Sequence, residues 1–493
     1  MSTLRHIMQV LHRVIGVIAG ILLTIWFISG LVLIYKPFPA ATEKEQIAHS
    51  VMLDPSDLQP MDSVWQIATG LSGKVQAAWI VNEFGRNTWH IKSEDRDIKR
   101  ISSGDISTES VTAEDCDFVA RQWCDAPVVR IDTLQRRDQW TMYTRYLNNL
   151  PMLLYRFGDK SKTWVYLDSK TAQVVQQSTR AERLWSWFGS IPHKFYFRPL
   201  REHTQTWISV LSICAALAAL DILLGFVLGV RLLVIRRRRT GRWGSPYHRK
   251  SYYWHHVLGL IFGIFLFTWA FSGAVALQKI PDWVVGGKNS MRISADKIYG
   301  RSFHLADYKL DYRDLFIHYN NIKRIDWLHL AEIPFYKITT ADSTYFVDAS
   351  AVEKPKPLNI SKQQWTKVVK RIHGTDVPIS VKLLEDYDRY YLSAFGALPL
   401  PVYRFEVEDG NGSLYYFNPA NGDYRYLDQK RKVKRWIFSE LHFLQYKLLI
   451  KYPAVWTIVI WFLVLGCIVA SLTGVWLSFV YLKRSVKKYL KKK

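Results

Sequence analysis

Two stretches of the chain are nearly alike, and each places a histidine at the start of an apolar run. Residues 11–30 read LHRVIGVIAGILLTIWFISG and residues 254–273 read WHHVLGLIFGIFLFTWAFSG, which aligns His12 with His255. A second pair recurs ahead of two later apolar runs, at His193 and His442. Histidine is the commonest metal ligand among side chains, and two neutral imidazoles facing each other are what a six-coordinate haem iron requires. The recurrence therefore predicts two metal-binding histidine pairs.

Glycines recur with the first histidine pair at intervals of four residues, as Gly16, Gly20, Gly259 and Gly263. Residues four apart share a helix face, so these glycines would leave room for a flat macrocycle against the backbone. The alternative interpretation is that Gly-xxx-Gly brings helices together and that the histidines are ordinary interfacial residues. Recurrence of all four histidines favours the metal-binding interpretation.

Four runs are apolar over the roughly 20 residues that a bilayer-spanning helix needs, at about 9–34, 205–230, 255–277 and 454–482. We therefore expect an integral membrane α-helical protein with two domains outside the membrane. The expected parts are a first helix with the N-terminal end (1–35), a first outer domain (36–203), a second helix (204–231), a basic loop (232–253), a third helix (254–278), a second outer domain (279–452), a fourth helix (453–482) and a basic tail (483–493).

The formal charge of +24 is unevenly distributed along the chain. The segments before Val14, between Arg231 and Tyr253, and after Lys483 contain no Asp or Glu. Lys and Arg concentrate on the cytoplasmic side of membrane proteins, so both termini and the basic loop are expected in the cytoplasm. The outer domains then lie in the periplasm of a bacterial inner membrane. Topology and contact with anionic lipids account for the basic runs, and no nucleic-acid partner is expected.

The likeness between the two halves extends over a whole unit of helix, outer domain and helix. The second and fourth apolar runs align at a constant offset of 249, which pairs Trp207 with Trp456. Both copies cross the membrane in the same direction, so the chain reads as a parallel internal duplication whose axis lies along the membrane normal. Such an axis brings equivalent residues to equal depth. We therefore expect His12 to face His255 near the cytoplasmic edge, and the second pair to face each other at the outer interface.

Each outer domain shows an α+β pattern. Residues 111–123 and 361–372 read as helices that begin near a Ser or Thr. Alternating segments around Ser169-Lys170 and around Asn421-Gly422 read as hairpins.

These features together resemble the PepSY-associated transmembrane (PepSY-TM) family. The resemblance rests on the LHRxxG motif leading into a glycine-punctuated helix, on strands that end in an aromatic residue and an Asp or Asn turn, and on an LH ahead of the last helix. It covers nearly the whole chain and implies two PepSY-like periplasmic domains. Members studied biochemically look like haem-containing ferric siderophore reductases of the inner membrane, whereas others are known only as iron-regulated membrane proteins.

Three further residues are candidates near the first histidine pair. His256 aligns with Arg13 rather than with a histidine; it could replace His255 as a ligand, or contact a haem propionate or lipid headgroups. Asp221 is the one acid deep in a membrane helix, where acids are costly and usually functional. It could serve proton or quinol chemistry, or hydrogen-bond a neighbouring Ser or Thr.

Two cysteines lie in the first outer domain, whose compartment would permit a disulfide. On one straight helix, Cys116 and Cys124 would be about 12 Å apart by helix rise, which is too far to bridge. A bond would need the chain to turn between them, and the sequence leaves this question open.

The leading functional hypothesis is an enzyme. Two b-type haems, one held by each histidine pair, would pass electrons to the periplasmic face, reduce a ferric siderophore or other ferric chelate, and release Fe(II). No GxGxxG follows a strand and no Walker motif occurs, so the electron donor would be a quinol or a cytoplasmic reductase. The alternative is a non-enzymatic, membrane-anchored PepSY binding or regulatory protein with structural histidines. A transporter subunit ranks last, because only the repeat supports it.

Overall fold

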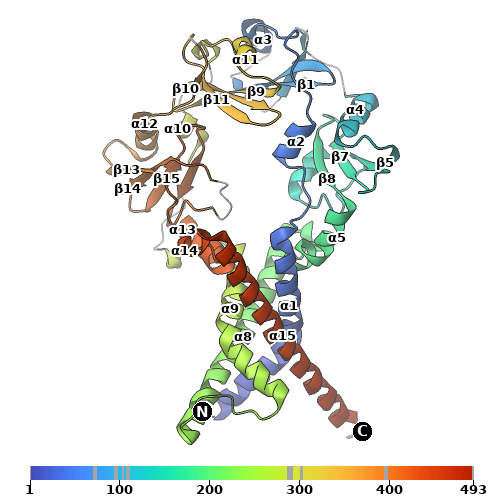
Figure 1. Ribbon diagram of the computed structural model, residues 1–493, viewed down its shortest axis with the longest axis vertical. Helices are drawn as coiled ribbons and strands as arrows, with labels where there is room; N and C mark the ends of the chain where they lie inside the picture. Colours follow the sequence, from blue (N-terminus) through green and yellow to red (C-terminus); the bar gives the residue numbers. More distant parts are fainter. Residues whose placement is uncertain are drawn as a thin grey trace.

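The computed structural model describes residues 2–69, 75–93, 98–102, 105–106, 111–285, 293–299, 304–352, 354–393 and 398–490. A bundle of long helices carries a head of sheets and short helices (Figure 1). Both chain termini lie at the end of the bundle that faces away from the head (Figure 1).

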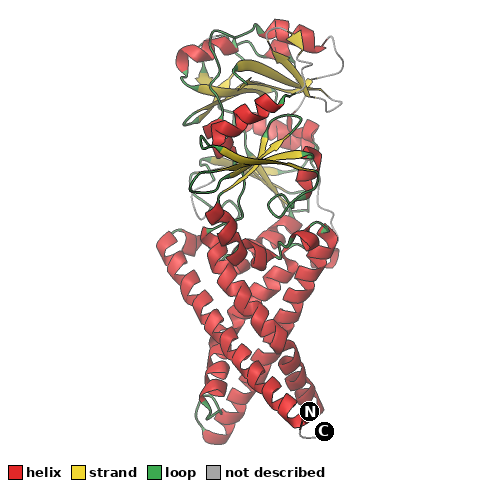
Figure 2. Cartoon of the chain, turned by 90° about the vertical axis from the view of Figure 1, so that its right-hand side faces the viewer, coloured by secondary structure: helices red, strands yellow, loops and turns green. Residues whose placement is uncertain are grey.

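Four helices form the bundle: α1 (Ser2–Tyr35), α8 (Thr204–Thr240), α9 (Lys250–Ala276) and α15 (Pro453–Leu490). Each is long and apolar enough to cross a membrane, and the chain is a multi-pass membrane protein. Helices α1 and α9 each pack against both α8 and α15. The helices cross and spread apart toward both ends (Figure 2), so the bundle is narrowest midway along its length.

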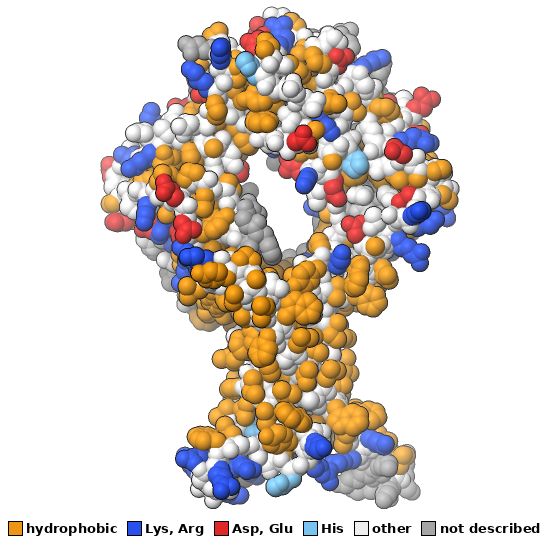
Figure 3. Space-filling model, viewed as in Figure 1, with side chains coloured by type: hydrophobic (Ala, Val, Ile, Leu, Met, Phe, Trp, Pro, Cys, Tyr) orange, Lys and Arg blue, Asp and Glu red, His pale blue; other side chains and the backbone are white. Residues whose placement is uncertain are grey.

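Large apolar side chains cover the outside of the bundle in a broad band (Figure 3). Ile18 is 73% exposed and Phe462 is 64% exposed. A water-soluble protein rarely leaves so large a continuous apolar surface uncovered, whereas lipid tails cover such a surface.

One end of the bundle carries both termini and the α8–α9 connection (Figure 1), and we call it the basic end. At this end the bundle helices extend further than the apolar runs suggest. The basic loop expected at 232–253 is helical up to Thr240, and α15 continues to Leu490. Arg, Leu and Lys are good helix formers, and residues 232–240 contain no Gly or Pro. Gly241 then ends α8 with a φ of 70°. The connection between α8 and α9 is therefore only residues 241–249.

The top of the head is one eight-stranded sheet with the order β12-β11-β10-β9-β1-β2-β3-β4. Its strands are β1 (Val75–Glu83), β2 (Arg86–Ser93), β3 (Ile98–Ser102), β4 (Asp105–Ile106), β9 (Ile322–Leu330), β10 (Ile333–Thr340), β11 (Thr344–Asp348) and β12 (Lys356–Pro357). Strand β1 from the first half of the chain pairs antiparallel with β9 from the second half, with Ile80 opposite Ile325. The segments 36–203 and 279–452, expected as separate domains, thus share one sheet.

The two halves also share the hydrophobic core of this sheet. Trp89 of β2 and Trp327 of β9 have ring centroids 4.4 Å apart, and both side chains are almost fully buried. Full burial of an aromatic side chain stabilises a fold by about 1.5–3 kcal/mol, so this core joins the halves firmly.

Two four-stranded sheets lie between the eight-stranded sheet and the bundle (Figure 1). Both are antiparallel meanders whose strands follow chain order. One contains β5 (Val128–Leu134), β6 (Met152–Phe157), β7 (Trp164–Asp168) and β8 (Val174–Ser178). The other contains β13 (Ile379–Leu384), β14 (Val402–Val407), β15 (Ser413–Phe417) and β16 (Tyr424–Leu427). The hairpins expected around Ser169-Lys170 and Asn421-Gly422 are confirmed as β7–β8 and β15–β16.

The two expected helices of the head are also confirmed. Helix α4 (Ala113–Trp123) begins at Thr112, and α12 (Lys362–His373) begins at Ser361. In each, the side chain at N3 bonds back to the cap in a capping box, which satisfies two of the free N–H groups of the first turn. Cys116 and Cys124 are both free thiols.

Short helices complete the head and connect it to the bundle. They are α2 (Glu43–His49), α3 (Met61–Thr69), α5 (Arg180–Phe188), α6 (Ser190–Lys194), α7 (Arg198–Arg201), α10 (Ala295–Tyr299), α11 (Leu315–His318), α13 (Gln429–Arg435), the π-helix η5 (Trp436–His442) and α14 (Lys447–Ile450). Short 3-10 helices lie at η1 (Thr144–Asn149), η2 (Asp282–Val284), η3 (Leu305–Asp307) and η4 (Tyr312–Asp314). The three sheets form an arch, and the space-filling view shows an open passage between the arch and the bundle (Figure 3).

Candidate functional site

The basic-end pair consists of His12 on α1 and His255 on α9. Their ring centroids are 6.3 Å apart and their planes differ by 23°. Two imidazoles that share one metal ion through N–metal bonds of about 2 Å place their ring centres roughly 6–6.5 Å apart. The rings therefore have the separation expected of two histidines that bind one metal ion.

The Nδ1 atom of each ring in the basic-end pair is held by another helix. His12 Nδ1 lies 3.0 Å from Asp221 Oδ1 and 3.1 Å from the carbonyl oxygen of Asp221. His255 Nδ1 lies 3.0 Å from Thr473 Oγ1, and that hydroxyl donates its own proton to the Ala470 carbonyl. Both Nδ1 atoms consequently act as donors, which leaves a lone pair on each Nε2.

The head-side pair consists of His193 in α6 and His442 at the end of η5. Their ring centroids are also 6.3 Å apart, with planes at 66°. His193 Nδ1 bonds the carbonyl of Trp26 at 3.0 Å and Ser29 Oγ at 3.4 Å. His442 Nδ1 bonds Ser272 Oγ at 2.9 Å.

The head-side serines fix the same tautomer as the partners at the basic end. Ser29 donates to the Trp26 carbonyl and Ser272 donates to the Trp269 carbonyl, so each hydroxyl oxygen accepts from the histidine. Within the part of the chain that the structure describes, none of the four Nε2 atoms has a protein hydrogen bond. Metal-binding histidines commonly present one nitrogen to the metal while the other donates to an oxygen in this way.

A residue with left-handed backbone conformation follows each head-side histidine by two positions. Helix α6 ends at Phe195, which has a left-handed φ of 52°. His442 ends a π-helix, and Leu444, two residues further on, has a φ of 51°. π-Helical turns are rare and frequent at functional sites, and here one carries a candidate ligand.

Burial keeps the head-side histidines neutral. It lowers the pKa of His193 to about 4 and that of His442 to about 3. In His442 the facing His193 lowers the pKa further, since two imidazolium charges would repel. Both rings are therefore neutral at pH 7, which is the form that binds a metal.

An apolar cavity of about 580 Å³ surrounds the head-side pair. It is bounded by Trp26 and Gly30 of α1, Trp269 and Gly273 of α9, and side chains of α8 and α15. This volume is typical of cofactor pockets. Gly30 lies against the imidazole of His193, where a Cβ would be 3.0 Å from Cε1, and Gly273 faces open space.

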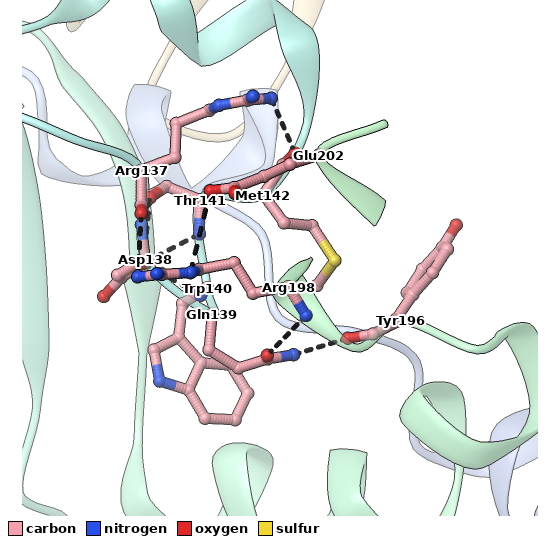
Figure 4. Close-up of polar contacts among 9 residues, drawn as sticks. All are labelled: Arg137, Asp138, Gln139, Trp140, Thr141, Met142, Tyr196, Arg198 and Glu202. Atoms are coloured by element: carbon pink, nitrogen blue, oxygen red, sulfur yellow. Dashed lines mark hydrogen bonds and ion pairs between the residues drawn. The ribbon is translucent and has the colours of Figure 1, made fainter. Parts of the chain in front are cut away.

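The head is bonded directly to the segment that carries His193. Gln139, in the loop between β5 and η1, donates to the Tyr196 carbonyl at 2.6 Å and accepts from the Arg198 amide at 3.1 Å (Figure 4). On the other side, buried Glu440 of η5 pairs with Arg389 at 3.0 Å. Loops of the two flanking sheets thus bond the segments that carry the head-side histidines.

The glycines predicted to face a macrocycle have different surroundings from those expected. A Cβ on Gly16 would lie 3.3 Å from Asp221 Oδ2, one on Gly20 would lie 3.4 Å from Val475, and one on Gly263 would lie 2.8 Å from Phe226. These three glycines admit neighbouring helices, as the packing alternative states. Gly259 alone among the four faces open space.

Of the other three candidates at the basic end, Asp221 contacts the histidine pair, whereas His256 and Arg13 do not. Asp221 contacts His12 rather than a Ser or Thr, as described above. His256 is 7% exposed and donates from Nε2 to the Gly229 carbonyl of α8 at 3.0 Å, so it contacts neither lipid headgroups nor the facing His12. Arg13 is exposed on the bundle surface.

Several residues of the two sites were missed by sequence reasoning, although the sequence contains a signal for them. WFISG at 26–30 and WAFSG at 269–273 are matching motifs. They supply the hydrogen-bond partners of the head-side pair and Gly30, which lies against His193. Gly225 and Gly474 play the corresponding part at the basic end, where they adjoin the rings of His12 and His255.

Comparison with known proteins identifies a family. The family model described as the PepSY-associated TM region matches residues 9–318, which is well over half of the chain. The protein therefore belongs to this family of membrane proteins. No curated protein and no solved structure matches the chain significantly.

Proposed function

We propose that this protein is a di-haem oxidoreductase of a bacterial inner membrane, which reduces a ferric chelate at its periplasmic face. The observation that carries the proposal is the geometry of the two histidine pairs. Each has ring centroids 6.3 Å apart, Nδ1 atoms held by oxygen partners, and Nε2 atoms without a protein partner among the described residues. His12 and His255 would hold one haem b, and His193 and His442 the other.

The two pairs lie at opposite ends of a membrane-spanning bundle. His12 and Gly30, which adjoins His193, are 18 residues apart on α1, or about 27 Å by helix rise. This is close to the thickness of the hydrocarbon core, about 30 Å. Haem bound by these histidines would supply one-electron transfer.

The charge distribution supports an orientation with the head in the periplasm. Lys and Arg gather at the end of the bundle where both termini lie (Figure 3), and the α8–α9 connection is at that end. Since basic residues mark the cytoplasmic side, the basic-end pair is the inner one. Electrons from a quinol or a cytoplasmic reductase would enter there.

The head leaves an opening through which a substrate would approach the bundle (Figure 3). An open passage lies between the arch and the bundle (Figure 3), and the head-side cavity lies at the head end of the bundle. The ferric siderophore as substrate is inferred from the family resemblance. Reduction would release iron because hard oxygen donors hold Fe(II) less tightly than Fe(III).

The likeness of the halves fits an origin by internal duplication, with two PepSY-like units. Both halves contribute a four-stranded meander of the same order, one histidine at each end of the bundle, and matching WxxSG motifs. A duplicated unit explains why each site takes one ligand from each half.

The test is the absorption spectrum and haem content of the detergent-purified full chain. We expect a Soret band, split α-bands on reduction, and about two haems per chain. Added ferric chelate should reoxidise the dithionite-reduced protein, with Fe(II) trapped by a chromogenic chelator. Absence of a Soret band would disprove the proposal and favour a binding or regulatory protein. Haem that is not reoxidised by any ferric chelate would leave an electron carrier with another acceptor.

A further inference from the structure

A single carboxylate lies inside the membrane-spanning part of the chain. Asp221 is the one Asp or Glu in the four bundle helices, and it is 5% exposed. Burying an acid in a membrane is costly, so such residues are rare and mark functional positions. Its position calls for a specific partner.

That partner is the ring of His12, which it contacts through two atoms. Oδ1 and the backbone carbonyl both lie within 3.1 Å of Nδ1, while Oδ2 is directed toward Gly16. Gly16 admits the carboxylate because it has no side chain. Among the described residues, no Lys or Arg forms an ion pair with Asp221, and its side chain is bonded to the imidazole of His12.

The other three candidate ligands have uncharged partners. His255 bonds a threonine hydroxyl, and the head-side rings bond a backbone carbonyl and serine hydroxyls. The residue equivalent to Asp221 in the second half is Ala470, which offers only its backbone to His255. The carboxylate is thus an asymmetry added to one of four otherwise comparable positions.

A carboxylate that accepts a hydrogen bond from Nδ1–H makes the imidazole a stronger electron donor at Nε2. The negative charge also sits in a low-dielectric surrounding, where electrostatic interactions are strong. Both effects stabilise the more positive ferric iron over the ferrous form. Hydrogen bonding to an axial ligand is one of the means by which a protein tunes such a potential.

We infer that Asp221 is a positioning residue that lowers the reduction potential of the basic-end site below that of the head-side site. Outward electron transfer is then downhill, and the direction is built into the bundle. The inference rests on the proposed haem sites and adds to them an order of potentials and the residue that sets it.

The test is a potentiometric titration of the full chain with Asp221→Asn and Asp221→Ala. Asparagine keeps the size and an accepting oxygen but removes the charge. In the wild type we expect two midpoint potentials, and in both variants the lower one should rise toward the higher, with the higher unchanged. Thr473→Val is the matched control, because it removes the neutral partner of the facing ligand and should shift the same midpoint less.

A second measurement covers variants that fail to retain haem. In the ferric wild type, the two low-spin electron paramagnetic resonance signals should differ, one showing the stronger axial donation. His442→Ala should retain that signal, which assigns it to the basic end. Unchanged midpoints in Asp221→Asn, or a stronger-donor signal assigned to the head side, would overturn the inference. A wild type without haem would instead refute the proposed function itself.

Discussion

The basic-end and head-side histidine pairs have the same ring separation, 6.3 Å, and oxygen partners on every Nδ1, but they differ in the angle between the rings and in the charge of the bonded groups. At the basic end the rings are within 23° of parallel, and one is bonded by a buried carboxylate. At the head side the planes are at 66°, the partners are neutral, and an apolar cavity of about 580 Å³ is present. The two pairs therefore keep the ring separation that suits a shared metal, while the groups bonded to the rings differ.

Removing single histidines has the largest expected effect. His12→Ala and His255→Ala should each lose the basic-end haem, about one of two per chain, while His193→Ala and His442→Ala should each lose the head-side haem. The reason is that, in the proposed arrangement, each haem would be held by two histidines from different helices. Haem content and reduced-minus-oxidised spectra of the purified variants measure this.

His256→Ala is the matched control for the histidine series. It removes an adjacent imidazole that bonds the Gly229 carbonyl and does not face His12. Both haems should remain. Loss of one haem in this variant, or of both haems in His12→Ala, would contradict the assignment of ligands.

A glycine substitution beside His12 should weaken haem binding at the basic end alone, through a steric clash. A Cβ on Gly225 would lie 2.6 Å from His12 Cε1, so Gly225→Ala must displace the ring. Overpacking of this kind costs about 1–3 kcal/mol, and we expect partial loss of the basic-end haem with the head-side haem intact.

Gly474→Ala is the control, since its Cβ would lie 3.3 Å from His255 Cε1 and a small adjustment can absorb it. Haem content per chain compares the two variants. Equal losses in both would show that the close approach at Gly225 does not position the ligand.

The head-side pair should also give haem-free protein a pH-dependent stability. The pKa values of His193 and His442 are lowered to about 4 and about 3, against about 6.5 in an unfolded chain. The unfolded state binds protons first, so stability is complete above about pH 7 and is lost as the pH falls from about 6.5 toward 4. Between pH 7 and 6 the pair should lose roughly 1–1.5 kcal/mol.

Thermal unfolding in detergent, followed from pH 7 to 6, measures this loss. His442→Gln removes one of the two titrating groups and should give a shallower dependence. The same slope in wild type and variant would show that these imidazoles are not held neutral by burial.

The smallest expected effect distinguishes the two serines of the head-side pair. Ser272 is 2.9 Å from His442 Nδ1, whereas Ser29 is 3.4 Å from His193 Nδ1, which also has the Trp26 carbonyl as a partner. A lost hydrogen bond of this kind costs about 1 kcal/mol. Ser272→Ala should therefore weaken head-side haem retention more than Ser29→Ala, as measured by transfer of haem to apomyoglobin. A larger effect of Ser29→Ala would reverse the assigned roles.

Much of this arrangement could be predicted from the sequence because it depends on local patterns. Apolar runs gave the four spans, and capping residues such as Thr112 and Ser361 gave the starts of α4 and α12. The recurrence of His12 as His255 led to the prediction that the two would lie at one depth, and the structure places their rings opposite each other. Haem binding itself stays a prediction.

The role of the glycines could not be predicted in the same way. Gly16 and Gly20 follow His12 on one helix face, but what that face meets depends on the rotation and crossing of α8 and α15. Those helices bring Asp221 and Val475 against the two glycines. A spacing of four residues states which positions share a face and not what lies opposite.

The sequence by itself determined that the chain spans a membrane four times, that its charge is uneven, and that histidines recur in two pairs. Only the tertiary structure decided that β1 and β9 join the halves in one sheet and that Asp221 bonds His12, a residue 209 positions away. The physical reason is that spans and caps arise from neighbours along the chain. Strand pairing and ligand partners arise between residues that meet only when distant segments have packed together.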